Sequence, residues 1–219
     1  MSTLSVEKLL TTTRSVRKRL DLTRPVSLEV IERCLETAIQ APTGSNAQGW
    51  RFMVITDPEK RKIIGDYYAK SFSTYAADSA KTAPKLASDD PRSERQGAVV
   101  DSAVYLARKF GEVPVFIIGC LEGRVENDGV MNQASFYGSI LPAAWSLMLA
   151  LRAEGLGTAW TTLHLRYEKE VSELLGIPDS FTQTVLFPVA YFKGDDFKPA
   201  KRVPVRELTY HDSWGQPLP

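Results

Sequence analysis

Apolar positions along this chain follow two different periods, which predicts a fold that mixes helices with strands. The helical period is clearest between Ser27, which can cap a helix, and Pro42, which can end it. Within that segment the apolar residues are spaced by three and four, as on one helix face: Ile31, Cys34, Leu35 and Ala38. Further helices are predicted over these segments: residues 4–10, from Asp57-Pro58-Glu59 onward, and residues 96–110, 131–153 and 167–175.

Four apolar segments predict one sheet of about four strands. Residues 113–120 form a continuous apolar run, which is typical of a strand buried on both faces. The other predicted strands are residues 50–56, 158–161 and 183–192. Pro188 lies in the last of these, and because proline cannot donate a ladder hydrogen bond, we predict an edge strand or a bulge there.

The segment 70–90 interrupts the regular pattern. It is rich in serine, alanine and aspartate, contains Pro84 and is followed by Pro91. We interpret it as a mobile helical excursion. Its aromatic residues, Phe72 and Tyr75, could stack on an aromatic ligand or could anchor the excursion to the protein, and the pattern does not separate these interpretations.

Residues 134–151 are nearly all apolar, but they barely reach the ~20 residues that a membrane span requires. We interpret them as part of a central helix, kinked at Pro142 and buried on most sides. A helix that is apolar all round in a small domain often needs a second chain to cover its outer face. We therefore expect an oligomer and no membrane span.

Chain length, net charge and cysteine content indicate the number of domains and exclude some classes of protein. The 219 residues suit one domain, residues 1–219, with a proline-rich tail over residues 193–219 that we expect to wrap over a neighbouring subunit. The net charge of +1 argues against a general nucleic-acid or membrane-surface binder. Cys34 and Cys120 are interpreted as buried free thiols, and the N-terminus lacks a signal-peptide pattern, so we expect a cytoplasmic protein.

Three polar segments could bind a flat, anionic molecule with hydrogen-bonding edges, and FMN is the candidate. The first segment is Arg14-Ser15-Val16-Arg17. Its guanidiniums could form forked hydrogen bonds to a phosphate or to the edge of a flavin, or the segment could be a solvated basic run. Residues 41–52 offer hydroxyls and amides, or form a helix-terminating turn whose polar groups cap one another. Arg202 is held between two prolines and could bind an anion, or could be an ordinary surface arginine.

The sequence lacks the motifs that are typical of several other functions. There is no G-x-G-x-x-G after a strand, no P-loop and no Gly-x-Ser-x-Gly. The two cysteines and two histidines never come within metal-ligand spacing, so we expect no metal. His164 follows a strand and is interpreted as a hydrogen-bonded structural histidine.

Taken in order, these segments resemble the FMN-dependent nitroreductase family. Residues 14–17 are similar to its R-S-x-R motif, and residues 41–52 to its A-P-S-x-x-N-x-Q-P-W-x-F segment. Residues 149–160 are similar to its L-x-A-x-x-x-G-L-G-T-x-W block, and residues 199–204 to its closing P-x-x-R-x-P. Each motif alone is weak, but four in register across residues 4–214 are a specific match.

The resemblance implies a three-layer α+β fold, with a mostly antiparallel sheet flanked by long helices in an intertwined homodimer. Two FMN sites would lie at the dimer interface. Arg14 and Ser15 would contact the phosphate and ribityl chain, Arg202 would hold the phosphate, and Arg17 would reach the pyrimidine end of the ring. The partner subunit would contribute the polar loop: Pro42, Thr43, Ser45, Asn46 and Gln48. The N5 or dimethylbenzene side would meet the residues after the glycine block: Thr161, Thr162 and Leu163.

The activity that the resemblance implies is hydride transfer from NAD(P)H to FMN and then to an electron-poor acceptor, such as a nitroaromatic or a quinone. Arg17 would stabilise charge on the flavin N1/O2 side. Segments 70–91 and 121–130 are expected to shape the acceptor pocket. Two alternatives stay open: a specialised family enzyme for enone reduction or dehalogenation, and a flavin-binding protein without turnover. The chain departs from the family pattern at Thr13, Gly49 and Ala200.

Overall fold

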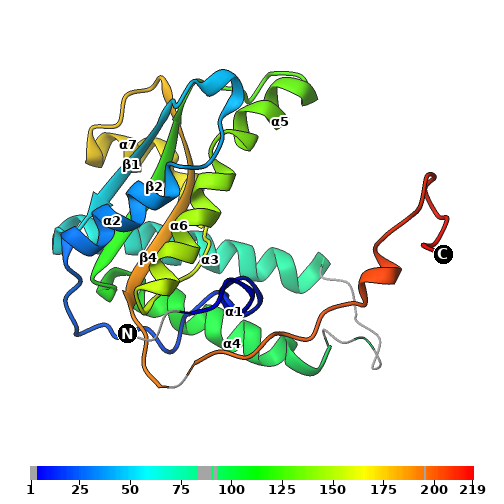
Figure 1. Cartoon of the computed structure of the whole chain (residues 1–219). Helices are drawn as coiled ribbons and strands as arrows, with labels where there is room; N and C mark the ends of the chain where they lie inside the picture. The colour runs from blue at the N-terminus through cyan, green and yellow to red at the C-terminus, as the bar shows by residue number, and fades with distance from the viewer. Residues whose placement is uncertain (1–3, 83–89, 91–92, 195) are drawn as a thin grey trace.

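The computed structural model describes residues 4–82, 90, 93–194 and 196–219 (Figure 1). One antiparallel sheet has the strand order β1-β2-β4-β3. Its strands are β1 (Trp50–Ile55), β2 (Val115–Glu122), β3 (Leu156–Thr158) and β4 (Phe181–Tyr191). The described helices are α1 (Val6–Thr12), α2 (Leu28–Ala38), α3 (Pro58–Thr82), α4 (Ser93–Lys109), α5 (Val130–Gly138), α6 (Leu141–Ala153) and α7 (Glu168–Leu175). The predicted α+β sheet protein is confirmed.

Alternating residues of the two central strands face two different helix layers. Val115, Ile117 and Phe187 belong to a buried cluster that includes residues of α2 and α6. Phe116 and Leu186 belong to the opposite cluster, which includes residues of α3, α4 and α7. Because side chains of a strand alternate in direction, this division places helices on both faces of the sheet. The molecule has three layers, as predicted.

The caps predicted for two helices are present. Ser27 Oγ accepts a hydrogen bond from the Glu29 N–H at the start of α2, at 3.2 Å. Asp57 accepts from the N–H groups of Glu59 and Lys60 at the start of α3, at 2.9 and 3.0 Å. These bonds satisfy donors that the first turn of a helix leaves free.

Residues 70–82 are a continuation of α3, which corrects the predicted excursion within the described part of that segment. Residues 83–89 of it lie outside the described residues. A Cβ on Gly65 would lie 2.7 Å from the Gly111 backbone nitrogen, so glycine permits α3 to approach the segment after α4 very closely. Phe72 packs against the core cluster beneath α3, which favours the anchoring interpretation, and Tyr75 is half exposed.

Pro188 lies in β4, between two neighbouring strands, so the prediction of an edge strand is wrong. Leu186 exchanges both backbone hydrogen bonds with Thr161, at 2.9 and 3.2 Å. Pro188 lies two residues after Leu186, so its backbone nitrogen faces the same neighbouring segment, residues 156–161. The pairing of this segment with β4 is interrupted between Thr158 and Thr161. The missing N–H of proline therefore falls at a gap in the pairing.

The apolar segment near Pro142 consists of two helices. α5 ends at Gly138, and α6 begins at Leu141 with Pro142 in its first turn. Among the described residues, Val130–Ala153 is one stretch long and apolar enough to cross a membrane, and 33% of its most apolar window is buried. The expectation of burial on most sides is therefore wrong, because α5 buries no residue and Trp145 of α6 is 39% exposed.

Both cysteines, Cys34 and Cys120, are buried free thiols, as predicted. Burial raises their pKa values to about 11 and about 12 respectively, which keeps both thiols protonated. The C-terminal residues leave the body of the molecule and extend away from the sheet (Figure 1). Trp214 in this tail is 91% exposed.

Candidate functional site

Residues 13–19 lie along the outer strand of the sheet. The Val16 N–H donates to the Thr158 carbonyl at 2.8 Å, and Val16 itself is buried. A Cβ on Gly157 would lie 3.0 Å from the Val16 side chain, so the glycine makes room for this segment. Anchoring at Val16 leaves its neighbours Ser15 and Arg17 free to face away from the sheet.

A cavity of about 720 Å³ opens beside this segment. It is lined by residues 13–19, the first half of α4, part of α6, and residues 197 and 200–202. Seven of the described lining residues are cations, and none is a carboxylate: Arg14, Arg17, Lys18, Arg19, Arg95, Lys201 and Arg202. Its apolar wall consists of Trp145, Met148 and Trp160, with smaller contributions from neighbouring residues. We call this the basic cavity.

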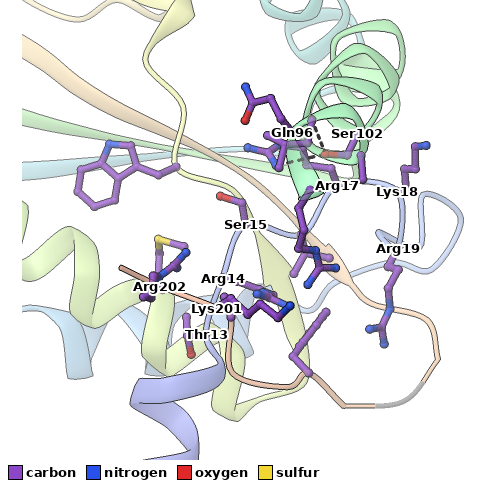
Figure 2. A pocket seen from close by; sticks show the side chains of 18 of the residues that line it. Thr13, Arg14, Ser15, Arg17, Lys18, Arg19, Gln96, Ser102, Lys201 and Arg202 are labelled. Atoms are coloured by element: carbon purple, nitrogen blue, oxygen red, sulfur yellow. Dashed lines mark hydrogen bonds between the residues drawn. The ribbon is translucent and has the colours of Figure 1, made fainter. Parts of the chain in front are cut away.

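Arg14, Lys201 and Arg202 gather on one side of the basic cavity, with Arg17 and Ser102 on the other (Figure 2). The pKa of Arg14 is lowered by burial first, and then by the charges of Arg95 and Arg202. Arg14, Arg95 and Arg202 form no ion pair with any described residue. Like charges held together without a carboxylate form a site that favours an anion.

Arg17 is held on the α4 side of the cavity. Its Nη1 donates to Ser102 Oγ at 3.4 Å, and its side chain is half-buried. Burial raises the pKa of Tyr68 in α3 to about 12, and the charge of Arg17 opposes that rise, which places the guanidinium near this phenol. Arg17 is therefore a fixed positive charge between two helices.

The C-terminal arm that carries Arg202 is attached to the body at Asp196. This carboxylate pairs with Lys8 Nζ at 2.5 Å and with the buried Arg152, and it accepts from the Phe197 N–H at 2.9 Å. Hydrogen bonds from Lys8, from the Phe197 backbone and from Arg152 lower the pKa of Asp196 to about 2. The next residues of the arm, from Phe197 on, return along the basic cavity.

Arg19 reinforces the same attachment. Its Nε donates to the Lys193 carbonyl at 2.6 Å, and its guanidinium lies 4.3 Å from the Phe197 ring centroid. Phe197 in turn packs on Phe192, with centroids 4.9 Å apart. Cation–π contacts of this kind add to the ion pairs that hold the arm.

The predicted loop Pro42, Thr43, Ser45, Asn46 and Gln48 does not line the basic cavity. It packs against α5 instead, where the Gly44 N–H donates to Ser139 Oγ at 3.0 Å. Its polar groups partly cap one another, since Gln48 Nε2 donates to Asn46 Oδ1 at 2.9 Å. Ser45, Asn46 and Gln48 nevertheless have positive φ values of 52°, 54° and 49°. Strained non-glycine backbone of this kind concentrates at functional sites.

The residues after the glycine block also lie apart from the basic cavity. Thr161 is buried and its Oγ1 donates to the Leu186 carbonyl at 2.6 Å, whereas Thr162 is exposed and Leu163 is half-buried. A single chain thus brings together four predicted residues, Arg14, Ser15, Arg17 and Arg202. The loop and residues 161–163 stay predicted site residues that one chain does not place in the cavity.

Several lining residues were not predicted: Arg95, Gln96 and Ser102 of α4, Trp145 and Met148 of α6, and Trp160. Arg95 precedes the predicted start of its helix, and nothing in its local pattern distinguishes it from other surface arginines. Trp160 ends the glycine-containing block at residues 149–160, so that motif is a sequence signal for its place at the cavity.

His164 is fully buried, and neither ring nitrogen has a hydrogen-bond partner among the described residues. The prediction that His164 is hydrogen-bonded is therefore wrong for the described residues. Burial lowers its pKa to about 3, so the ring is neutral. Within the described residues no group of three metal-binding side chains occurs.

Residues 10–191 match the nitroreductase family, and the chain belongs to that family. YfhC of Bacillus subtilis (strain 168), provisionally named an NAD(P)H nitroreductase, is 24% identical over 200 residues, covering 89% of this chain and 87% of YfhC. An iodotyrosine deiodinase of Thermotoga neapolitana is 28% identical over 175 residues, covering 78% and 80%. The crystal structure of an oxidized iodotyrosine deiodinase bound to FMN and 3-iodo-L-tyrosine has a TM-score of 0.69 at 23% identity, over 94% of this chain and 100% of that one.

Proposed function

We propose that this protein is an FMN-dependent oxidoreductase that uses NAD(P)H to reduce electron-poor acceptors such as nitroaromatics or quinones. The observation that carries the proposal is the basic cavity, in which Arg14, Arg95 and Arg202 converge without a carboxylate. Family membership and the fold shared with an FMN-bound deiodinase support the choice of FMN as the anion.

The donor set fits this cofactor. Arg14 and Arg202 supply forked cations, and Ser15 supplies a hydroxyl, for a terminal phosphate. Trp145, Met148 and Trp160 supply apolar surface for a flat ring. When bound, FMN would supply the redox chemistry, which is hydride exchange with NAD(P)H and with a second substrate at one open face.

The protein contributes electrostatics to this chemistry. Arg17 is the proposed catalytic residue, since its positive charge would stabilise negative charge on the N1/O2 side of the flavin during hydride transfer. Single donors in comparable positions contribute about 3 kcal/mol. The described residues of the cavity include no carboxylate to act as a general acid, so the proton that the acceptor takes up with each hydride would come from solvent through the open cavity.

We infer a cytoplasmic homodimer in which the loop 42–48 serves the flavin of the partner. Support comes from the exposed, strained backbone of that loop and from exposed apolar surface next to it. Val130 and Met131 of α5 are 85% and 79% exposed, and the tail carries the exposed Trp214. Burial of such surface in a second copy is favourable.

A second candidate function is reductive dehalogenation, which the deiodinase relatives favour. Both activities use the same cofactor, so the cavity does not separate them. Steady-state assays of the FMN-loaded protein with NADH or NADPH separate them, using nitrofurazone, menadione and 3-iodotyrosine as acceptors.

The proposal predicts consumption of NAD(P)H with nitrofurazone or menadione and little iodide release. Iodide release from 3-iodotyrosine with slow nitrofurazone reduction would establish the dehalogenase instead. An FMN-loaded protein that turns over none of the three acceptors would be a flavin-binding protein without this activity.

A further inference from the structure

Arg95 lies in the first turn of α4 and lines the basic cavity together with Arg14 and Arg202. The three guanidiniums come from three separate parts of the chain: the N-terminal segment, α4 and the C-terminal arm. We propose that Arg95 is a third residue that binds the phosphate monoester of the cofactor. This inference rests on the proposed function, because it concerns the same cavity.

One face of α4 lines the cavity and is hydrogen-bonded to the N-terminal segment. Arg95, Val99 and Ser102 are spaced by four and three residues, so they share one face of the helix, and all three line the cavity. Ser102 accepts the bond from Arg17 at 3.4 Å, which ties this face to the N-terminal segment. Arg95 therefore lines the cavity as part of a helix face turned toward it.

The electrostatics of the cluster support a shared anion. Arg95 lowers the pKa of Arg14, after the effect of burial and ahead of the effect of Arg202. Arg95 has no carboxylate partner among the described residues that would offset this repulsion. A ligand with a negative charge relieves it.

The charge and shape of a phosphate monoester match three guanidiniums better than two. Such a phosphate carries about −1.5 to −2 charges at pH 7 and three terminal oxygens, each a strong acceptor. Each guanidinium presents several donors in a planar fork. The N-terminal segment provides only one guanidinium at this end, because Thr13 and Ser15 beside Arg14 carry hydroxyls.

The test compares FMN with riboflavin, which lacks the phosphate. Flavin-free protein is titrated with each flavin by fluorescence quenching, as wild type and as Arg95→Gln. We expect Arg95→Gln to weaken FMN binding about tenfold and riboflavin binding less than twofold. Arg108→Gln, in the last turn of the same helix and away from the cavity, should leave both affinities unchanged.

A second measurement, the melting temperature, reports the repulsion among the three arginines. Arg95→Gln should raise the melting temperature of the flavin-free protein by about 1–2 °C, yet reduce the stabilisation that FMN adds. Arg95→Lys keeps the charge but loses the fork, so its preference for FMN over riboflavin should be intermediate.

The outcomes distinguish this inference from the proposed function. If wild type binds FMN and Arg95→Gln binds it equally well, Arg95 is not a phosphate ligand, although the proposed function stands. A variant that only raises the KM for NADPH would assign Arg95 to the second substrate and overturn the inference. If wild type binds neither flavin, both proposals fail.

Discussion

Arg17 differs from Arg14 and Arg202 of the basic cavity because it has a hydrogen-bond partner among the described residues. Its bond to Ser102 and its position near Tyr68 hold one charge in place. Arg14 and Arg202 have no such partner. The first arrangement suits a residue that must not move during the reaction, and the second suits residues that pair with a bound anion.

Arg17→Ala is expected to slow reduction of bound FMN by NAD(P)H about a hundredfold, with a much smaller loss of FMN affinity. The physical reason is that the charge is needed most when negative charge develops on the flavin. Stopped-flow reduction and FMN titration measure the two effects separately. Arg17→Lys, which keeps the charge, should recover part of the rate, whereas equal losses of rate and affinity would refute the electrostatic role.

His164 predicts a specific dependence of stability on pH. Its pKa is near 6.5 when unfolded and about 3 when folded, so between these values the unfolded chain binds a proton that the folded chain does not. The free energy of unfolding should therefore fall as the pH drops below about 6.5, by up to about 1.4 kcal/mol per pH unit.

Urea unfolding at several values between pH 7 and pH 5 measures this slope. His164→Leu should flatten it, because the titrating ring is removed while the site stays filled. His211→Gln, on the exposed tail, serves as the matched control and should keep the wild-type slope. An unchanged slope in His164→Leu would show that other groups control acid stability.

At the level of elements, the site depends on how two flanking segments attach to the sheet. The N-terminal segment is held by Val16 against Gly157, and the C-terminal arm by Asp196 against α1 and α6. Val16 lies between Arg14 and Arg17, and Asp196 lies a few residues before Arg202, so each attachment is close in sequence to the cations that it positions. Loss of either attachment should therefore displace cations that line the basic cavity.

Asp196→Asn should destabilise the protein by about 1–2 kcal/mol, because it leaves the buried Arg152 without its counter-charge at a partly exposed junction. It should also weaken FMN binding several-fold, since Arg202 loses its fixed position. Asp179→Asn, on an exposed turn, is the control for a lost surface charge. A loss of stability with unchanged FMN affinity would show that Asp196 does not position Arg202 for FMN binding.

Elements with strong local signals were predictable from the sequence, and those decided by distant contacts were not. The caps at Ser27 and Asp57 and the buried strand β2 follow from local residue types and periodicity. The depth of Pro188 in the sheet depends on strand order, which no local pattern encodes. Arg95 is similar: its role arises only when α4 packs beside the N-terminal segment.

At the scale of the whole molecule, one chain holds two separate groups of predicted flavin residues. The basic cavity has the phosphate-binding groups, while the strained loop 42–48 packs against α5. A homodimer that places the loop of one chain over the cavity of the other accounts for both. We propose that the same homodimer covers the exposed apolar residues of α5 and of the tail.

Mixed dimers test this arrangement directly. Arg14→Ala and Asn46→Ala homodimers should each bind FMN poorly at both sites. A purified heterodimer with one chain of each kind should regain one intact site and bind about half the wild-type amount of FMN, measured by titration. A heterodimer that regains no site would place Arg14 and Asn46 in the same chain's site.

The most direct test of the central proposal is anaerobic addition of NADPH, and separately NADH, to the FMN-loaded protein while its visible absorbance is followed. We predict that at least one nucleotide bleaches the yellow colour and that menadione then restores it. A protein that binds no FMN, or whose bound FMN neither nucleotide bleaches, would not be an NAD(P)H-dependent FMN oxidoreductase.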